Sequence, residues 1–225
     1  MLFINNSETF MHKLNIKNMP HVKATLKAEH NIIYEDTETL IIYNPKAETY
    51  IAEGVANTII AKIKKLPINR LETSNKQVFD YFYATRQFKY HQICLQCYHK
   101  PIKGSAKLDL PSSEEIKWIA ETYETSESEI ALMRKKNEIF VYRKNGKAVS
   151  YVGIHIDGSI GFLYTEPTHR QQGYASKIEE ELFKIKKEPI FSQILADNKA
   201  SIAFHKKNKW KFNRYKIYWL FNQRF

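Results

Sequence analysis

Hydrophobic positions recur with two periods in the second half of the chain, and they predict alternating helices and strands. The segment PSSEEIKWIAETY places glutamates behind a serine, with Ile116, Ile119 and Ala120 on one face, which predicts a capped helix. A shorter helix is predicted in SESEIALMRKK. The runs EIFVYRK and AVSYVGIHI flank Asn145-Gly146, a dipeptide typical of a hairpin turn, and SIGFLYTEP follows as a third strand.

The pattern returns to helical spacing after this third strand. In QQGYASKIEEELFKIKK, apolar residues from Tyr174 to Ile185 follow a helical period, and the helix is predicted to begin at Gln171 or Gln172. The remaining segments are read as a buried strand, a helix and a long strand, in PIFSQILA, NKASIAFHKKN and WKFNRYKIYWLF.

The first half shows a comparable alternation. NIIYED and TLIIYN form a candidate hairpin, TYIAEG a strand, VANTIIAKIKK a helix and NRLETS a strand. A helix in NKQVFDYFYATR and a strand in YHQICLQCYHK complete it. Because Pro111-Ser112-Ser113 follows the polar stretch KGSAK, we place a boundary there, between a supporting α/β domain at 1–110 and a second domain at 111–225.

Both halves end in a similar strand–helix–strand segment. Aligning Asn75 with Asn198 brings Phe88 onto Trp210 after one gap. Two interpretations stay open: the N-terminal domain is a degenerate half-repeat of the second, or both halves share common helix–strand patterning.

Composition fits a globular chain. Of 225 residues, 43% are hydrophobic and 13% aromatic, and no apolar run approaches the roughly 20 residues that span a bilayer. The N-terminus lacks a basic segment followed by an apolar core, so we expect a cytoplasmic protein without membrane association. The net charge of +11 (35 basic against 24 acidic residues) comes from residues spread along the chain, which favours surface lysines or a polyanionic ligand over nucleic acid.

The two cysteines, Cys94 and Cys97, form a single C-x-x-C in a predicted strand. Residues three apart in a strand point to opposite faces, so we expect buried apolar side chains rather than a metal site.

The glycines are concentrated in one short stretch of the chain, and because glycine allows tight turns and close approach of a ligand, we look for the functional site there. Five of the seven lie between Gly146 and Gly173. The run from Tyr164 to Ala175 takes the chain from a strand, through Pro167 and a short basic loop, into a helix. The first turn of a helix offers unpaired N–H groups to an anion, and Gly173 and Ala175 keep that approach open. The alternative is an ordinary strand-to-helix connection.

This run resembles the acetyl-CoA motif [RQ]-x-x-G-x-[GA] of the GNAT superfamily, in the glycine N-acyltransferase-like branch. Arg170, Gly173 and Ala175 fit its fixed positions. A second family element, N-x-x-[AS]-x-x-[LF]-Y-x-x-x-G-F, is matched at Asn198, Ser201 and Phe204. The sequence departs from it with His205 for tyrosine, Lys209 for glycine and Trp210 for phenylalanine. The resemblance covers residues from about 112 to 225.

The resemblance implies an α/β (α+β) GNAT fold, in which a mixed, mostly antiparallel central sheet is flanked by helices. It also implies an acetyl-CoA or other acyl-CoA co-substrate whose pantetheine enters where the strand of Leu163, Tyr164 and Thr165 splays from PIFSQILA. A backbone N–H near Leu163 would polarise the thioester carbonyl. The pyrophosphate would lie on the amides of five residues, Gln171, Gln172, Gly173, Tyr174 and Ala175. Asn198, Ser201 and Phe204 would complete the cofactor site, without a metal.

The proton-transfer groups are less well defined. Glu166 lies close to the motif, and His155 and Asp157 close the preceding strand, so each is a candidate base. His205 occupies the family's tyrosine position, which implies that it protonates the departing CoA thiolate; the alternative is a solvated histidine in a basic helix.

The expected activity is N-acyl transfer from acyl-CoA to a primary amine of a small molecule or amino acid, by direct attack, in a monomer or homodimer. Two alternatives stay open. One is a protein or peptide N-acetyltransferase, and the other is a CoA-binding module that has lost catalysis, which the departures at His205 and Lys209 would suit.

Overall fold

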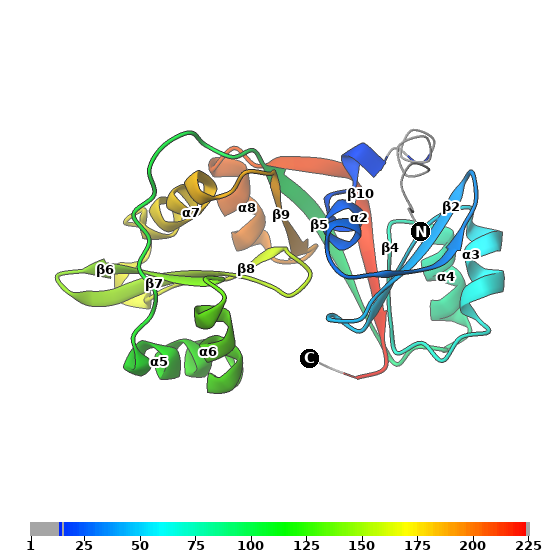
Figure 1. Cartoon of the computed structure of the whole chain (residues 1–225), viewed down its shortest axis with the longest axis horizontal. Helices are drawn as coiled ribbons and strands as arrows, with labels where there is room; N and C mark the ends of the chain where they lie inside the picture. Colours follow the sequence, from blue (N-terminus) through cyan, green and yellow to red (C-terminus); the bar gives the residue numbers. More distant parts are fainter. Residues whose placement is uncertain (1–13, 15, 224–225) are drawn as a thin grey trace, which may run out of the picture. The chain divides into compact units, whose positions relative to one another are not determined.

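The computed structural model describes residue 14 and residues 16–223 of the chain (Figure 1). The chain forms two compact units. One consists of Met1–Cys97, Gln193–Lys207 and Lys211–Phe225, and the other of Tyr98–Ser192 and Asn208–Trp210. This division differs from the contiguous domains expected at 1–110 and 111–225, because segments near the C-terminus pack with the N-terminal half.

The first unit is built on a mixed sheet with the strand order β1-β2-β3-β4-β10-β5-β9. Its strands are β1 (Asn31–Glu35), β2 (Thr39–Asn44), β3 (Thr49–Gly54), β4 (Arg70–Thr73), β5 (Tyr90–His99), β9 (Ile190–Leu195) and β10 (Lys211–Phe221). The pairs β1–β2, β2–β3 and β4–β10 are antiparallel, and β3–β4 is parallel. Two of these strands cross the division between the units: the end of β5 and the beginning of β9 belong to the second unit.

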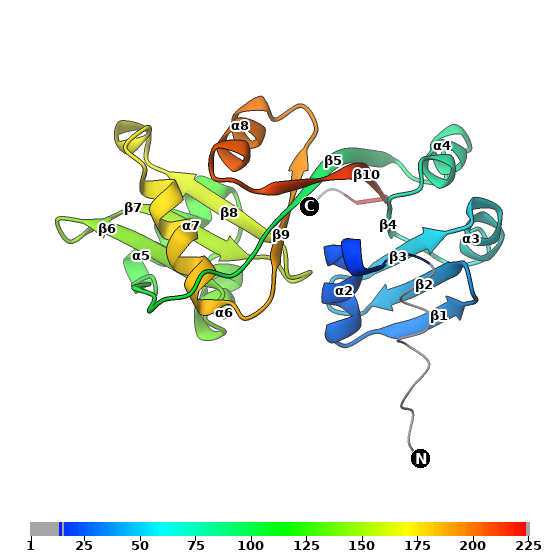
Figure 2. The same ribbon diagram turned by 90° about the horizontal axis from the view of Figure 1, so that it is seen from above.

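Helices cover both faces of this sheet (Figure 2). η1 (Ile16–Asn18) and α2 (Pro20–Lys27) pack on one face, and α3 (Ala56–Ile63) and α4 (Lys76–Ala84) pack on the other. Helix α8 (Lys199–Lys207) belongs to the same unit. Ile41 packs with residues of α3 and α4, whereas its neighbours Leu40 and Ile42 pack with Val22 of α2. This alternation is what a strand buried on both faces requires. The hydrophobic pattern did not predict helix α2, which begins with a proline, or the short 3-10 helix η1 before it.

The two strand–helix–strand segments are interleaved in the sheet. β10 lies between β4 and β5, and β5 lies between β10 and β9. Each helix begins with an asparagine cap: Asn75 accepts hydrogen bonds from the N–H groups of Gln77 and Val78, and Asn198 accepts one from Ser201. Both segments therefore share a local design, while the suggested ancestry of a half-repeat stays a prediction.

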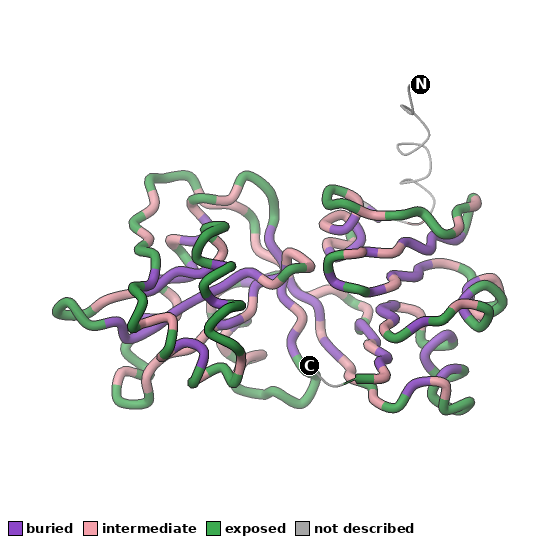
Figure 3. The backbone as a smooth tube through the Cα atoms, turned by 60° about the horizontal axis from the view of Figure 1, so that its bottom comes forward, coloured by how far each residue is buried: buried purple, intermediate pink, exposed green. Residues whose placement is uncertain are grey.

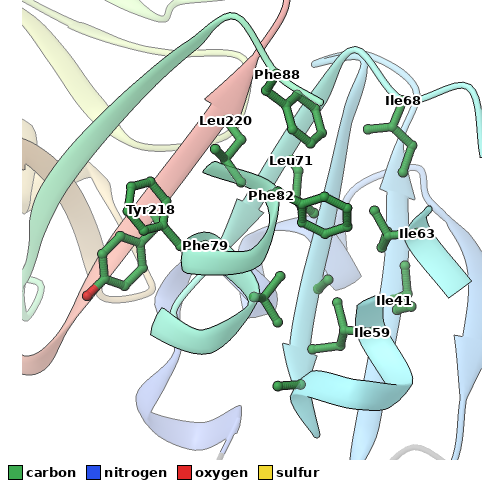
Figure 4. Close-up of a cluster of buried hydrophobic side chains, with 13 residues drawn as sticks. Ile41, Ile59, Ile63, Ile68, Leu71, Phe79, Phe82, Phe88, Tyr218 and Leu220 are labelled. Atoms are coloured by element: carbon green, nitrogen blue, oxygen red, sulfur yellow. The ribbon is translucent and has the colours of Figure 1, made fainter. Parts of the chain in front are cut away.

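The core of the first unit joins residues from both ends of the chain (Figure 4). Phe79 and Phe82 of α4 pack with Leu71 of β4 and with Tyr218 and Leu220 of β10. The Phe79 and Tyr218 rings are stacked with their centroids 4.7 Å apart. Because buried apolar area is the main stabilising contribution to a fold, these contacts bind the C-terminal strand to the N-terminal half.

The second unit contains an antiparallel three-stranded sheet in the order β6-β7-β8. Its elements are α5 (Ser113–Tyr123), α6 (Glu127–Lys135), β6 (Ile139–Lys144), β7 (Lys147–Ile154), β8 (Ile160–Thr165), η2 (Pro167–His169) and α7 (Tyr174–Ile185). Helices α5 and α6 cover one face, and α7 covers the other (Figures 1 and 2). Buried residues lie mainly on the strands, and exposed ones on helices and turns (Figure 3).

Local sequence signals predict most of these elements correctly. The capping box of α5 is present, since the Ser112 side chain accepts from the Glu115 N–H and the Glu115 carboxylate accepts from the Ser112 N–H. Asn145 and Gly146 both have positive φ, as the predicted hairpin turn requires. The expected mixed, mostly antiparallel sheet flanked by helices is confirmed.

Cys94 and Cys97 are free thiols and are both buried, as expected. Burial raises the pKa of Cys94 to about 12, so this thiol is unreactive near neutral pH. No helix in the described part of the chain is both long enough and apolar enough to cross a membrane.

Candidate active site

The loop between β8 and α7 has an unusual backbone that exposes its amides. Gly173 is the N-cap of α7 and has φ +84, and Gln171 has φ +59. Left-handed residues interrupt helical geometry, so α7 begins at Tyr174 and not at Gln171 or Gln172 as predicted. Alternation between left-handed and other conformations turns successive N–H groups towards one side, which is the geometry of an anion-binding nest.

The amides of this loop have no acceptor within the described chain. From Gln171 to Ala175, none of the backbone N–H groups donates a hydrogen bond to another residue of 16–223. Gly173 carries no capping side chain, and a Cβ built on it would have no heavy atom within 4 Å. The first turn of α7 contains no acidic residue. Open amides, the positive end of a helix and the absence of an acidic side chain in the first turn are the features that favour an anion.

Cationic side chains lie around the same loop. The Lys144 and Lys177 ammonium groups lie 5.6 Å and 5.5 Å from the centroid of the Tyr174 ring. The Arg170 Nε donates to the carbonyl of Thr165 at 3.0 Å, which ties the guanidinium to the end of β8. Phosphate groups bound at the loop would therefore meet three positive charges.

The predicted pantetheine strand, β8, is the edge of its sheet. Leu163, Tyr164 and Thr165 lie in its second half, with Thr165 paired to Ser150 of β7. Ser159, the residue just before β8, forms one isolated parallel bridge with Phe191 of β9. No ladder joins β8 to another strand on its outer side in the described residues. An edge strand offers unpaired backbone groups to an extended ligand.

A bulge interrupts β8 at the point where the resemblance places the thioester. The pairs Tyr151–Tyr164 and Gly153–Gly161 differ by one residue in register, so Phe162 and Leu163 together face Val152. Phe162 has φ +52, which is rare for a bulky side chain and marks local strain. A bulge removes a residue from the regular ladder and reorients its backbone groups. This feature was not visible in the sequence, because phenylalanine gives no signal of positive φ.

Glu166, the candidate base nearest the motif, accepts a hydrogen bond from the Trp118 indole N–H at 2.7 Å. Its backbone N–H continues the sheet by donating to Val149. The carboxylate thus lies on the face of the sheet that α5 covers, and Trp118 is a partner that sequence reasoning did not identify.

The second predicted cluster lies on α8, in the other compact unit. Asn198 caps the helix through the Ser201 N–H at 3.0 Å, and the Phe204 and His205 rings meet edge to face at 5.3 Å. His205 is buried, with its Nδ1 2.8 Å from the Ser201 carbonyl. Burial lowers the pKa of His205, although the bond to Ser201 raises it in part. At neutral pH the imidazole is therefore uncharged, and its proton is on Nδ1, which donates to the Ser201 carbonyl.

A buried carboxyl group that the sequence analysis did not select lies on α7. Glu179 Oε2 accepts from Asn208 Nδ2 at 3.2 Å and from Trp210 Nε1 at 3.4 Å. Burial raises the pKa of Glu179 to about 8. Lys209, between these partners, has φ +62. The lysine thus adopts the left-handed conformation for which the family element has glycine.

The Acetyltransferase (GNAT) family model matches residues 105–210. None of the curated proteins matches the chain. Solved structures resemble it over nearly their whole length. A GCN5-related N-acetyltransferase from Kribbella flavida has a TM-score of 0.57 at 8% identity, covering 94% of this chain and 96% of that one. A GNAT-family acetyltransferase from Colwellia psychrerythraea has a TM-score of 0.52 at 11% identity, covering 97% and 98%. At such identities the likeness concerns the fold alone.

Proposed function

We propose that the chain, whose residues 105–210 match the Acetyltransferase (GNAT) family model, transfers an acetyl or other acyl group from acyl-CoA to a primary amine of a small molecule or amino acid. The observation that carries this proposal is the run of open backbone amides from Gln171 to Ala175 at the start of α7. It follows directly on a bulged edge strand, so that phosphate, pantetheine and thioester positions succeed one another along the chain.

The proposed roles follow from this order. The diphosphate of CoA lies on the amides of the loop, beside Arg170, Lys144 and Lys177. The pantetheine amides pair with the outer edge of β8 near Thr165. The bulge directs the N–H of Leu163 towards the thioester oxygen, where it stabilises the charge that develops as the amine attacks.

The chemistry is a direct displacement. The neutral amine attacks the thioester carbonyl carbon, a C–N bond forms, and the C–S bond breaks to release the CoA thiolate. One proton must leave the acceptor nitrogen and one must reach the sulfur. Asn198, Ser201, Phe204 and His205 remain proposed members of this site on the strength of the family resemblance, with His205 as the proposed donor to the sulfur and Glu166 as a candidate base.

Acetyl-CoA binding and turnover test the proposal in two steps. Calorimetric titration with acetyl-CoA is expected to give one site per chain. Release of CoA is then followed with a thiol reagent over amines, amino acids, polyamines and peptides. The background from the protein is expected to be low, since Cys94 and Cys97 are both buried.

Each outcome has a defined meaning. Turnover on free amines or amino acids supports the proposal, and turnover on peptides alone assigns the protein acetyltransferase function instead. Binding without turnover on any acceptor identifies a CoA-binding module. Failure to bind acetyl-CoA contradicts the proposed site.

A further inference from the structure

Two titratable side chains lie against the β8 bulge on the face that α5 and α6 cover. Tyr123 is the last residue of α5, and its ring stacks on Phe162 with centroids 4.0 Å apart. Its phenol oxygen accepts a hydrogen bond from the Phe162 N–H. His155 follows β7, and its ring lies 4.6 Å from that of Phe162. Both groups thus contact the one strained residue of the proposed thioester site.

Gly161 is what allows the imidazole to lie there. A Cβ built on Gly161 would come 1.8 Å from Nε2 of His155 and 2.4 Å from its Cδ2. Any other residue at this position would displace the ring. The His155 imidazole therefore rests directly on the backbone of β8, one residue before the bulge.

At neutral pH the surroundings favour the deprotonated form of His155 and the protonated form of Tyr123. Burial lowers the pKa of His155, although the carboxylates of Asp157 on its own turn and Glu129 on α6 raise it in part. Burial raises the pKa of Tyr123, an effect that the Phe162 N–H partly offsets. The imidazole is thus an uncharged base and the phenol a neutral hydroxyl. Paired groups with pKa values moved apart are typical of acid–base sites.

We propose that His155 is the base that takes the proton from the acceptor amine, and that Gly161 and Tyr123 are positioning residues for it. This inference rests on the proposed acyl transfer. His155 accepts one proton from the acceptor ammonium, which leaves a neutral amine to attack the thioester. The nitrogen of the addition intermediate loses a second proton as the C–S bond breaks, and the thiolate gains one through His205, its proposed donor, so the number of protons is conserved. The imidazolium returns its proton to solvent.

The reach from His155 to the thioester suits this role. Consecutive Cα atoms are about 3.8 Å apart, so Leu163 lies within about 8 Å of Gly161. An acceptor nitrogen attacking a carbonyl bound at the Leu163 N–H would thus meet Nε2 directly or through one water. Glu166 lies further along the strand and is engaged by Trp118.

The pH dependence of turnover tests the proposal. With acetyl-CoA and the fastest acceptor of the amine screen, kcat/KM of His155→Gln is expected to fall roughly 100- to 10,000-fold at pH 7, the usual range for general base catalysis. Wild-type kcat/KM is expected to level off at a lower pH than an ordinary imidazole would give, because burial lowers the pKa of His155. In His155→Gln, kcat/KM should keep rising with pH up to the pKa of the acceptor amine, because without the base only amine that is already neutral in solution reacts.

Three further variants separate positioning from general disruption. Gly161→Ala, which displaces the ring, should reproduce the pH profile of His155→Gln. Gly153→Ala is the comparison, because the nearest atoms to its Cβ would be those of Ile139, Met133 and Phe162, so it crowds the bulge from the neighbouring strand and is expected to keep the wild-type pH profile. Tyr123→Phe keeps the stacked ring and removes the hydroxyl, and a smaller loss in kcat is expected from it, with KM for acetyl-CoA unchanged.

A binding experiment gives a readout that needs no acceptor. In histidine-labelled protein, assigned by comparison with His155→Gln, the His155 resonance should shift when acetyl-CoA is added, while that of His30 in the first unit should not. An unchanged His155 resonance in protein that binds acetyl-CoA would overturn the proposal, as would a His155→Gln profile that matches wild type. If acetyl-CoA itself fails to bind, the proposed function fails, and the inference with it.

Discussion

At the scale of single residues, Gly173 offers the sharpest test of the anion site. Its φ of +84 and the open space in front of it suit a phosphate. Gly173→Glu places a side chain and a negative charge there, and is expected to abolish acetyl-CoA binding while the fold persists. Wild type should gain about 2.7 kcal/mol of unfolding free energy at ligand 100-fold above Kd, and the variant none. Gly146→Glu, also at a left-handed turn with open space, is the matched control. A variant stabilised as much as wild type would rule out this loop.

Glu179 makes the stability of the chain depend on pH. Its pKa is raised by burial to about 8 in the folded state, against 4.5 for an ordinary glutamate. The folded state therefore holds this proton more tightly than the unfolded state. The resulting stabilisation is complete below about pH 4.5 and is lost as pH rises to about 8, at up to about 1.4 kcal/mol per pKa unit.

Denaturant unfolding at pH 5 and pH 8 checks this sign. Glu179→Gln keeps an acceptor for Asn208 and Trp210, and it should be more stable than wild type at pH 8, with a smaller loss between the two pH values. The exposed neighbour Glu180→Gln should keep the wild-type difference. A Glu179→Gln variant with the wild-type pH dependence would show that this carboxyl group is not the cause.

His205 can be tested by exchanging it for the residue of the family element. If it protonates the CoA thiolate, His205→Phe should lower kcat by roughly 10- to 1000-fold with acetyl-CoA affinity little changed. His205→Tyr should retain more activity, because it restores a hydroxyl donor. The lowered pKa and the bond to Ser201 describe a neutral imidazole, so the effect should be examined from pH 6 to 9. Wild-type rates for both variants would exclude the role.

At the scale of elements, β8 is expected to change from an edge strand to an inner one when acetyl-CoA binds. The pantetheine would pair with its outer side, and the loop amides would donate to phosphate oxygens. Amide exchange should therefore slow in residues 162–165 and 171–175. β7, already paired on both sides, serves as an internal control. Hydrogen exchange with and without acetyl-CoA measures this, and equal protection of β8 in both states would argue against strand-like pairing.

At the scale of the whole molecule, the interleaved sheet makes the two halves interdependent. Tyr218 and Leu220 of β10 pair with β4 and pack on α4, both from the N-terminal half. A fragment of residues 111–225 would expose this strand and its apolar face, so it is expected to lack cooperative unfolding and dispersed NMR signals, unlike the full chain. A fragment that unfolds cooperatively would instead support the contiguous domain at 111–225.

The sequence by itself determined the local features of this protein. Ser112 and Glu115 define a helix start, Asn145-Gly146 a turn, and Arg170 to Ala175 a family motif, because each depends on residues close together in the chain. Tertiary structure decided the rest. Four features depend on segments that are distant in the sequence. They are the left-handed conformation of Phe162, the contact of His155 with Gly161, the burial that raises the pKa of Glu179, and the position of β10 between β4 and β5. No local pattern encodes those contacts, because strand pairing and burial are set by the whole fold.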